Sequence, residues 1–524
     1  MSNKNQLTLL LISSLIIFVV FLITRLPFFL YYPVPDITPD YSSYYVLVDQ
    51  MTHHQIPHFD VRTPGFPFFL YVIFLFTYQI FAVVAAQNIL TLVAALFFVY
   101  SVFRTYRKLT FFTSVALAAF ISSSLHISMD TTPLTESLYV NLLLLTFAFF
   151  ILAVRLKKPI YFILCSVFIG LSIYVRPTAV LFLPICLITF LFLLRNKFNI
   201  KCIIGFMIPM PVLVVALMAN NYFTINSFAL NNFGEITMTL TTSTFLDTDR
   251  AYPQKLNYAI EKVKSRVSYE DRDILLNSWD LVKLDRAFST LKYWDNSLVF
   301  GPLHEALKDL PDKQQRYWYR RISKDAIAKY PAVYTKLFLV NMARYHWLYM
   351  KYDTDFYDEV AQRYKFLYID KGYMSAPTDE LKRGMLREYY DPRPLKFFEV
   401  KTADNGQVSV ACKQTLLKEI HDNFRLKIQQ PIFRKSFWSV IMFAVFLLSF
   451  FVLLSSKFTH TGAFILFVMV SAAVLSGLIT SLSNFTLIRY SYTLEFVNYL
   501  SLALLPMLMM KGQEKQTHEK DIIC

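Results

Sequence analysis

Residues 7–30 read LTLLLISSLIIFVVFLITRLPFFL, and Arg25 is the one charged residue among them. A helix needs about 20 predominantly apolar residues to cross a hydrocarbon core, and this run is long enough. No small-residue cleavage site follows it, so we predict a retained membrane anchor and not a removed signal peptide. This span indicates the fold class together with the similar apolar runs that recur along the chain.

Further apolar runs follow along the 524 residues, and 55% of the chain is hydrophobic, a share that is high for a soluble protein. We therefore predict a polytopic α-helical membrane protein. The runs are Phe66–Ile80, Ala82–Phe103, Phe111–Leu125, Glu136–Val154, Ile160–Val175, Ala179–Leu194, Cys202–Ala219, Phe437–Leu454, Ala463–Leu482 and Ser491–Met510.

Many of the lysines and arginines behind the net charge of +15 lie in short loops between these runs. Such residues mark cytoplasmic loops and attract anionic lipid head groups, so we predict contact with membrane lipids and no nucleic-acid partner. The predicted cytoplasmic loops are Arg104–Lys108, Arg155–Lys158, Arg195–Lys201 and the tail from Lys511.

These loops fix the direction of each span. They predict about ten membrane-spanning helices with both termini in the cytoplasm. In this arrangement Phe66–Ile80 has to begin and end outside. Its length as a helix is only about 22 Å, at 1.5 Å per residue, so we predict an interfacial or re-entrant helix there.

Three parts follow from this topology. Residues 1–222 form an N-terminal membrane module whose first outer loop is residues 33–67. Residues 223–434 form a mainly helical extracytoplasmic domain, because Lys255–Val267 and Ile322–Tyr349 carry apolar residues at helical spacing. Residues 435–524 add the last spans and a cytoplasmic tail. Cys412 is the one cysteine of the outer segment, which excludes a disulfide within it.

The first outer loop carries two carboxylates, Asp36 and Asp40. Thr38-Pro39 is a typical helix start, which places Asp40 in a first helical turn, where it favours the helix dipole. On pattern alone Asp40 is either such a helix-start residue or a rigidly held base at the membrane boundary. Binding of a divalent cation by the two carboxylates is a further alternative, for which the sequence shows no additional ligands.

A further carboxylate on the outer side lies at the start of a later span. Thr135 has the pattern of an N-cap and Glu136 that of a first-turn acid, so capping competes here with a catalytic role. Asp130, in the loop just before, is a weaker candidate.

Three arginines, Arg62, Arg176 and Arg489, lie at outer membrane boundaries, where few positive charges are expected. A guanidinium binds phosphate through two parallel hydrogen bonds, and three at one face favour an anionic ligand over snorkelling or simple pairing. Tyr490 is a neighbour of the third. Secondary candidates for assisting a phosphate or a metal are three histidines of the first loop, His53, His54 and His58.

Four short motifs occur in order along the chain: Pro39–Tyr45 with Arg62–Pro67, then Thr135–Leu138, Tyr174–Thr178, and Arg489-Tyr490 with Glu495. Together they resemble the GT-C glycosyltransferases of the protein-mannosyltransferase-like group, which is family 39-like. In that group a first-loop aspartate is followed by a tyrosine-containing helix, here with Tyr44, and by an R-x-P-G-[YF]-P knuckle. Where some members carry an adjacent Asp-Glu pair, this chain has Tyr41 after Asp40.

The resemblance implies a GT-C-like enzyme that moves a sugar from a polyprenyl-phosphate donor to a lipid, glycan or protein acceptor, with inversion expected. Asp40 would deprotonate or orient the acceptor, and Glu136 would orient the sugar or a supporting group. Arg62, Arg176 and Arg489 would hold the leaving phosphate. The expected location is a bacterial-type plasma membrane, with the active site on its extracytoplasmic face. A glycan ligase or polymerase and a lipid-linked glycan flippase are the alternatives.

Overall fold

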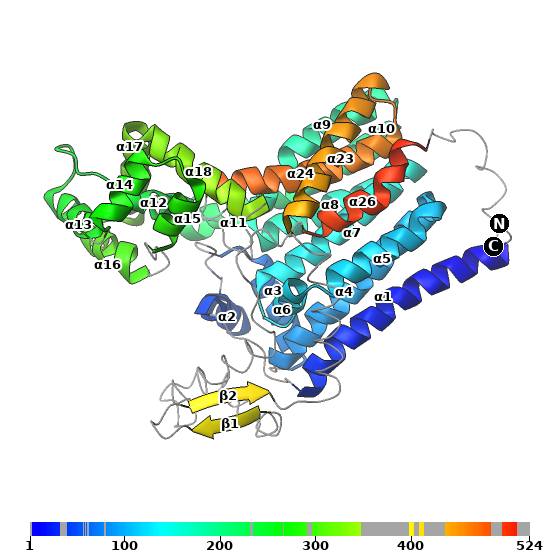
Figure 1. Ribbon diagram of the computed structural model, residues 1–524, viewed down its shortest axis with the longest axis horizontal. Helices are drawn as coiled ribbons and strands as arrows, with labels where there is room; N and C mark the ends of the chain where they lie inside the picture. Colours follow the sequence, from blue (N-terminus) through cyan, green and yellow to red (C-terminus); the bar gives the residue numbers. More distant parts are fainter. Residues whose placement is uncertain are drawn as a thin grey trace.

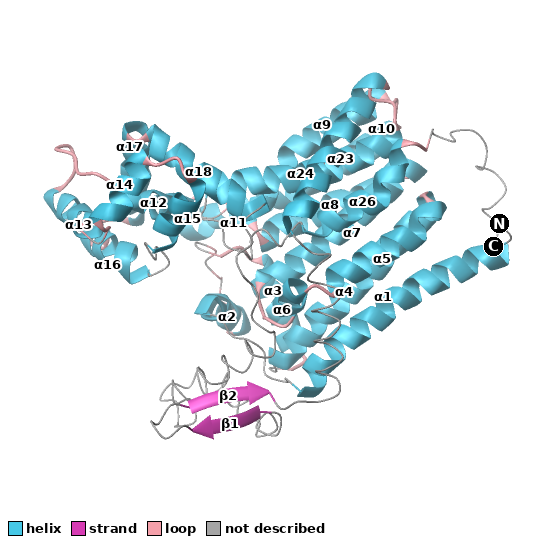
Figure 2. Ribbon diagram, in the orientation of Figure 1, coloured by secondary structure: helices cyan, strands magenta, loops and turns pink. Residues whose placement is uncertain are grey.

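Helices make up most of the chain in the computed structural model (Figures 1 and 2). The structure describes residues 3–31, 39–55, 57, 59, 62–77, 80–230, 234–265, 267–290, 296–346, 398–402, 408–412, 435–483 and 495–510.

The helices form a bundle and an outer group. The bundle contains α1 (Asn3–Tyr31), α2 (Pro39–Thr52), α3 (Gly65–Phe74), α4 (Ile80–Thr105), α5 (Thr110–Ile121), α6 (Ser124–Asp130), α7 (Thr135–Leu156), α8 (Pro159–Val175), α9 (Phe182–Arg195), α10 (Ile200–Met207), α11 (Pro209–Ile225), α23 (Lys435–Ser455), α24 (Thr461–Ser483) and α26 (Glu495–Leu504). The outer group contains α12 (Gly234–Thr242), α13 (Gln254–Lys264), α14 (Tyr269–Asn277), α15 (Leu281–Thr290), α16 (Asn296–Leu307), α17 (Asp312–Lys329) and α18 (Pro331–His346).

Among the described residues, six helices are long and apolar enough to cross a membrane: Asn5–Leu26, Phe81–Thr105, Thr135–Leu156, Pro177–Arg195, Ile200–Ile225 and Thr461–Leu478. Four shorter apolar helices accompany them: Gly65–Phe74, Pro159–Val175, Val440–Ser455 and Glu495–Leu508. These lengths and compositions agree with the predicted helical membrane protein, whereas the count of ten spans stays a prediction.

The positively charged loops meet at one end of the bundle. Arg155 lies over the ring of Tyr106, which joins the end of α7 to the end of α4. Cys202 donates a hydrogen bond to the α7–α8 loop, and Arg195 Nε donates to the carbonyl of Lys457 at 2.6 Å. The ends of α4, α7, α9 and α23 therefore share one side, which fits the predicted span directions. In Figure 1 the start of α1 also lies there, far from α2, α3 and α6.

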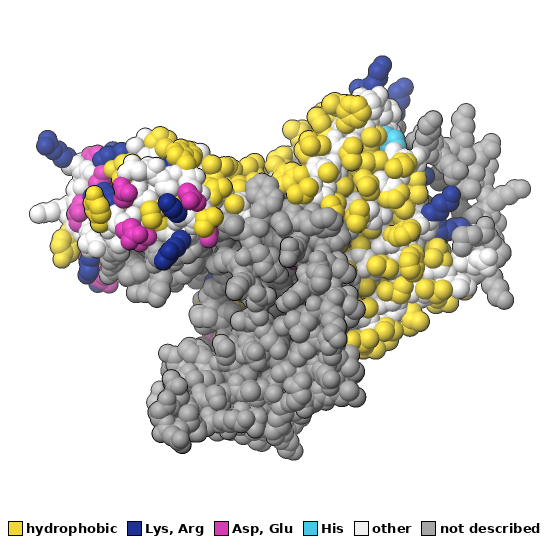
Figure 3. Space-filling view, viewed as in Figure 1, with side chains coloured by type: hydrophobic (Ala, Val, Ile, Leu, Met, Phe, Trp, Pro, Cys, Tyr) yellow, Lys and Arg dark blue, Asp and Glu magenta, His cyan; other side chains and the backbone are white. Residues whose placement is uncertain are grey.

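Apolar side chains cover the outside of the bundle. Leu15 of α1 is 58% exposed and Phe451 of α23 is 69% exposed, whereas nearly all of α7 is buried at the centre. Figure 3 shows hydrophobic side chains spread over the visible face of the bundle, while charged side chains gather over the outer helices. Such an apolar exterior suits contact with lipid and not with water.

Prolines divide two of the predicted helical stretches. Within the apolar stretch Ile200–Ile225, a single bend at Ile208 separates α10 from α11, where Pro209 opens the second helix. In the outer segment, Pro331 separates α17 from α18 within Ile322–Tyr349. Proline has no N–H for the helix ladder and its ring clashes with the preceding turn, so each ends one helix and begins another.

The run Phe66–Ile80 forms one short helix. Helix α3 has ten residues, Gly65–Phe74, and is therefore only about 15 Å long. Helix α4 then begins at Ile80. The predicted short helix before a long span is therefore present, and it is shorter than a hydrocarbon core.

The outer helices have a core of their own, with Leu256, Ile260, Leu284 and Leu303 each fully buried in it. This agrees with the mainly helical character predicted for the outer segment, whose predicted limits at 223 and 434 stay predictions. Beyond α18, the structure describes two antiparallel strands that the apolar spacing did not indicate, β1 (Phe398–Thr402) and β2 (Val408–Cys412).

Candidate functional site

The knuckle of the first outer loop packs on helix α2. Arg62 Nε donates to Ser43 Oγ at 2.9 Å, and its Nη1 donates to the Tyr44 hydroxyl at 3.2 Å. The guanidinium carbon also lies 4.7 Å from the centroid of the Tyr44 ring. Tyr44 is 5% exposed and packs edge-on against Phe66 of α3. Arg62 is thus held by α2 one turn after the position of Asp40.

The same knuckle docks on the last turn of α8. The hydroxyl of Thr63 donates to the carbonyl of Val175 at 3.1 Å. A Cβ on Gly65 would come within 2.7 Å of the backbone of Tyr174 and Val175, so the two chain segments approach too closely for any side chain. This contact sets Arg62 and Arg176 on neighbouring segments, although 113 residues separate them in the sequence.

Glu136 and Arg176 form an ion pair between the start of α7 and the end of α8. Arg176 Nη1 lies 3.2 Å from Glu136 Oε1, with side-chain exposures of 11% and 3%. The guanidinium also lies over the ring of Tyr139. Glu136 is in the first turn of α7, as predicted.

The predicted capping role of Thr135 is wrong. The N-cap position belongs to Leu134, and Thr135 is the first residue of the helix itself. Its hydroxyl donates to Glu136 Oε2 at 3.0 Å and thereby occupies the second oxygen of the paired carboxylate. Because the chain turns one residue earlier than the pattern indicated, Thr135 supports Glu136 instead of the helix end.

The first-loop residues divide between the two ends of α2. Asp40 lies in its first turn, while its side chain, like Asp36 and His58, falls outside the described residues. His53 and His54 follow its last turn, and the His53 ring bonds the carbonyl of Asp49 at 2.9 Å. At 1.5 Å per residue, these histidines are about 20 Å from Asp40 along the helix. They therefore do not join the predicted carboxylate site.

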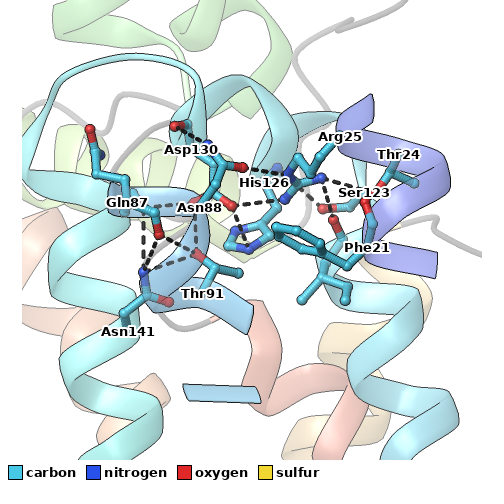
Figure 4. Close-up of polar contacts among 12 residues, drawn as sticks. Phe21, Thr24, Arg25, Gln87, Asn88, Thr91, Ser123, His126, Asp130 and Asn141 are labelled. Carbon is cyan, nitrogen blue, oxygen red and sulfur yellow. Dashed lines mark hydrogen bonds and ion pairs between the residues drawn. The ribbon is translucent and has the colours of Figure 1, made fainter. Parts of the chain in front are cut away.

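Asp130 lies at the centre of a buried polar network (Figure 4). Its carboxylate pairs with Arg25 of α1 at 2.8 Å, and both side chains are almost inaccessible, at 0% and 1% exposed. Asp130 Oδ1 accepts hydrogen bonds from Ser137 at 2.6 Å and from Thr91 at 3.2 Å. Asp130 is therefore bonded to α7 at Ser137, the residue after Glu136. Its carboxylate oxygens already bind protein groups.

His126 completes this network from within α6. Its Nε2 lies 3.3 Å from Asp130 Oδ2, and its ring lies against Phe120. Burial lowers the pKa of His126 to about 4, while the Asp130 carboxylate opposes that shift and Arg25 adds to it. The imidazole is therefore neutral at pH 7. No motif singled out His126, and its i,i+4 spacing from Asp130 was the one available signal.

The remaining predicted residues cannot be placed against this site. Arg489 and Tyr490 fall outside the described residues, which resume with Glu495 at the start of α26. Within the described part of the chain, no three His, Cys, Asp or Glu side chains come together in a way that could hold a metal ion. No protein-family model, curated protein or solved structure matches this chain.

Gly65→Ala tests the contact between the knuckle and the α8 turn. The added methyl meets backbone atoms, which cannot rotate away, so we expect a loss of about 1–3 kcal/mol in stability. Gly301→Ala in α16 is the control, because nothing lies within 4 Å of its added Cβ and alanine favours a helix. Thermal unfolding of the purified proteins measures both. Equal midpoints for Gly65→Ala and the unchanged chain would contradict the close approach.

Proposed function

We propose that this chain is a membrane glycosyltransferase of the GT-C type, which transfers a sugar from a polyprenyl-phosphate donor to an acceptor on the extracytoplasmic face, with inversion. The observation that carries the proposal is the docking of Thr63 and Gly65 on the turn that precedes Arg176. This docking brings together two of the four motifs at the end of the bundle away from the basic loops, and the Glu136–Arg176 pair adds a third.

The charges at this end suit a phosphate-linked donor. Arg62 and Arg176 lie on the two docked segments and supply guanidinium groups for the leaving phosphate, whose negative charge grows in the transition state. Glu136 holds Arg176 in place through their ion pair. Asp40, at the start of the helix that also holds Arg62, is the proposed base for the acceptor hydroxyl. The exposed apolar faces of the bundle offer the polyprenyl chain a place beside the lipid.

The decisive experiment supplies purified chain in proteoliposomes with radiolabelled single-sugar polyprenyl phosphates and candidate lipid, glycan and protein acceptors. Transfer of one labelled sugar with release of polyprenyl phosphate is the expected result. Transfer of a preassembled glycan would indicate a ligase or polymerase instead. Movement of the donor across the bilayer without transfer would indicate a flippase, and either result would overturn the proposal.

A further inference from the structure

The most deeply buried ion pair in the described bundle stands apart from the proposed phosphate site. Arg25 uses three nitrogens at once: Nε donates to Asn88 Oδ1 at 2.8 Å, Nη1 donates to the carbonyl of Ile121 at 2.9 Å, and Nη2 pairs with Asp130. Figure 4 shows these side chains pointing toward one another. One guanidinium therefore connects α1 to α4, to the end of α5 and to α6, and four of its five N–H groups donate to protein oxygens when the bond from Nη1 to Thr24 Oγ1 is included.

The acidic partner fixes the start of α7. Asp130 is the last residue of α6, and its Oδ1 accepts from Ser137 across the short connection between the two helices. Gln87 of α4 donates to the carbonyls of Thr132 and Leu134 at 3.3 Å each, which clamps the connection itself. Glu136 stands between the clamped carbonyl of Leu134 and the bonded hydroxyl of Ser137. Its direction toward Arg176 is thus set by groups on either side of it.

The basic partner fixes the entry to the first outer loop. Arg25 lies six residues before Tyr31, the last residue of α1, after which that loop begins. The same ion pair therefore joins the last part of α1, which leads to the loop that bears Asp40, to the connection before the helix that bears Glu136. A buried ion pair contributes little stability for the desolvation that it costs, and the best-attested use of such pairs is to fix the register of packed elements.

We propose that the Arg25–Asp130 pair is a positioning device that fixes the start of α7, and with it Glu136, relative to the first outer loop. Arg25 and Asp130 are positioning residues that act through Glu136 and do not touch the donor. The catalytic part of this inference rests on the proposed glycosyl transfer, whereas the mechanical part does not.

The mechanical part is tested by hydrogen–deuterium exchange of the full chain in detergent micelles. Ser137→Ala removes the link from Asp130 to α7 and leaves the ion pair in place, and Asp130→Asn removes the charge. Because local opening limits exchange, we expect the exchange rate of residues 131–142 to rise at least about fivefold in both variants. In Asp130→Asn we also expect the exchange rate of residues 39–52 to rise. Thr146→Val, deeper in α7 where the hydroxyl bonds the carbonyl of Leu142, is the control with unchanged exchange outside its own turn. Unaltered exchange in both test variants would overturn the proposal.

The catalytic part is tested by combining Asp130→Asn with Glu136→Gln and measuring transfer per folded protein. Asp130→Asn misdirects Glu136, so we expect kcat to fall by about tenfold while the KM for the donor stays within about threefold of the unchanged chain. In a chain that already carries Glu136→Gln, we expect Asp130→Asn to lower kcat by less than about twofold. Equal losses in both backgrounds would reduce the pair to general support of the fold and overturn its positioning role. Ser137→Ala replaces Asp130→Asn in this cycle should the latter fail to fold. Absence of transfer by the unchanged chain would refute the proposed function and leave the exchange experiment to decide the mechanical inference.

Discussion

Replacing Asp40 with asparagine should lower the transfer rate by about 10²–10⁴-fold, because asparagine cannot accept the proton of the acceptor hydroxyl. The substitution keeps the size of the side chain and removes only the interaction of the carboxylate with the helix dipole, which contributes about 0.3–1 kcal/mol in a first helical turn. Helix α2 should therefore form as before, with Arg62 still bonded to Ser43 and Tyr44. Transfer per folded protein, measured in proteoliposomes at saturating donor, is the appropriate readout.

Asp49→Asn provides the matched control for Asp40. It makes the same chemical change in the same helix, at the end where Asp49 pairs with His53 and both side chains are well exposed. An exposed pair of this kind contributes little, so we expect transfer within about twofold of the unchanged chain. A loss of only a few-fold in Asp40→Asn, comparable to the control, would return Asp40 to the role of a helix-start residue.

The second large effect is expected at the Glu136–Arg176 pair. Arg176→Gln leaves Glu136, 3% exposed, without its cation, which should cost about 3–5 kcal/mol of stability. It also removes a guanidinium from the proposed phosphate site, and loss of one such electrostatic group lowers the rate by about 10²–10³-fold. Thermal unfolding and donor-dependent transfer measure the two effects separately.

A double substitution separates the structural effect from the catalytic one. In Arg176→Gln with Glu136→Gln no buried charge is left unpaired, so stability should return to within about 1 kcal/mol of the unchanged chain while transfer stays low. Arg195→Gln, at the opposite end of the bundle, removes an exposed arginine and should alter transfer by less than twofold. Recovery of transfer in the double variant would mean that Arg176 serves only to neutralise Glu136.

Glu136 illustrates how much of the candidate site local pattern could predict. The first-turn position of its carboxylate follows from sequence near Leu134–Ser137, and the structure places it there. Its partner could not be predicted in that way, because Arg176 is 40 residues further along the chain and reaches Glu136 only through the packing of α8 on α7. The Thr135 cap failed for a related reason, since a one-residue change in the turn converts a cap into a first helical residue.

Arg25 and Asp130 show the limit more clearly. The sequence shows Arg25 as the one charge in an apolar span, where an unpaired charge would be costly. The local pattern does not identify the carboxylate that pairs with Arg25. Asp130, 105 residues away, became a buried structural anchor, whereas on pattern alone it was a weak catalytic candidate.

Apolar helices long enough to cross a membrane, the basic loops between them and the helices of residues 254–264 and 322–346 could be predicted from the sequence. Those features depend on apolar run length, on charge between runs and on apolar spacing, all of which are local. Three contacts emerge only when the helices pack: the first-loop knuckle meets the last turn of α8, Glu136 pairs with Arg176, and Arg25 anchors Asp130. Those contacts depend on how helices pack against one another, where the close approach at Gly65 and the need to pair each buried charge select a few partners among many.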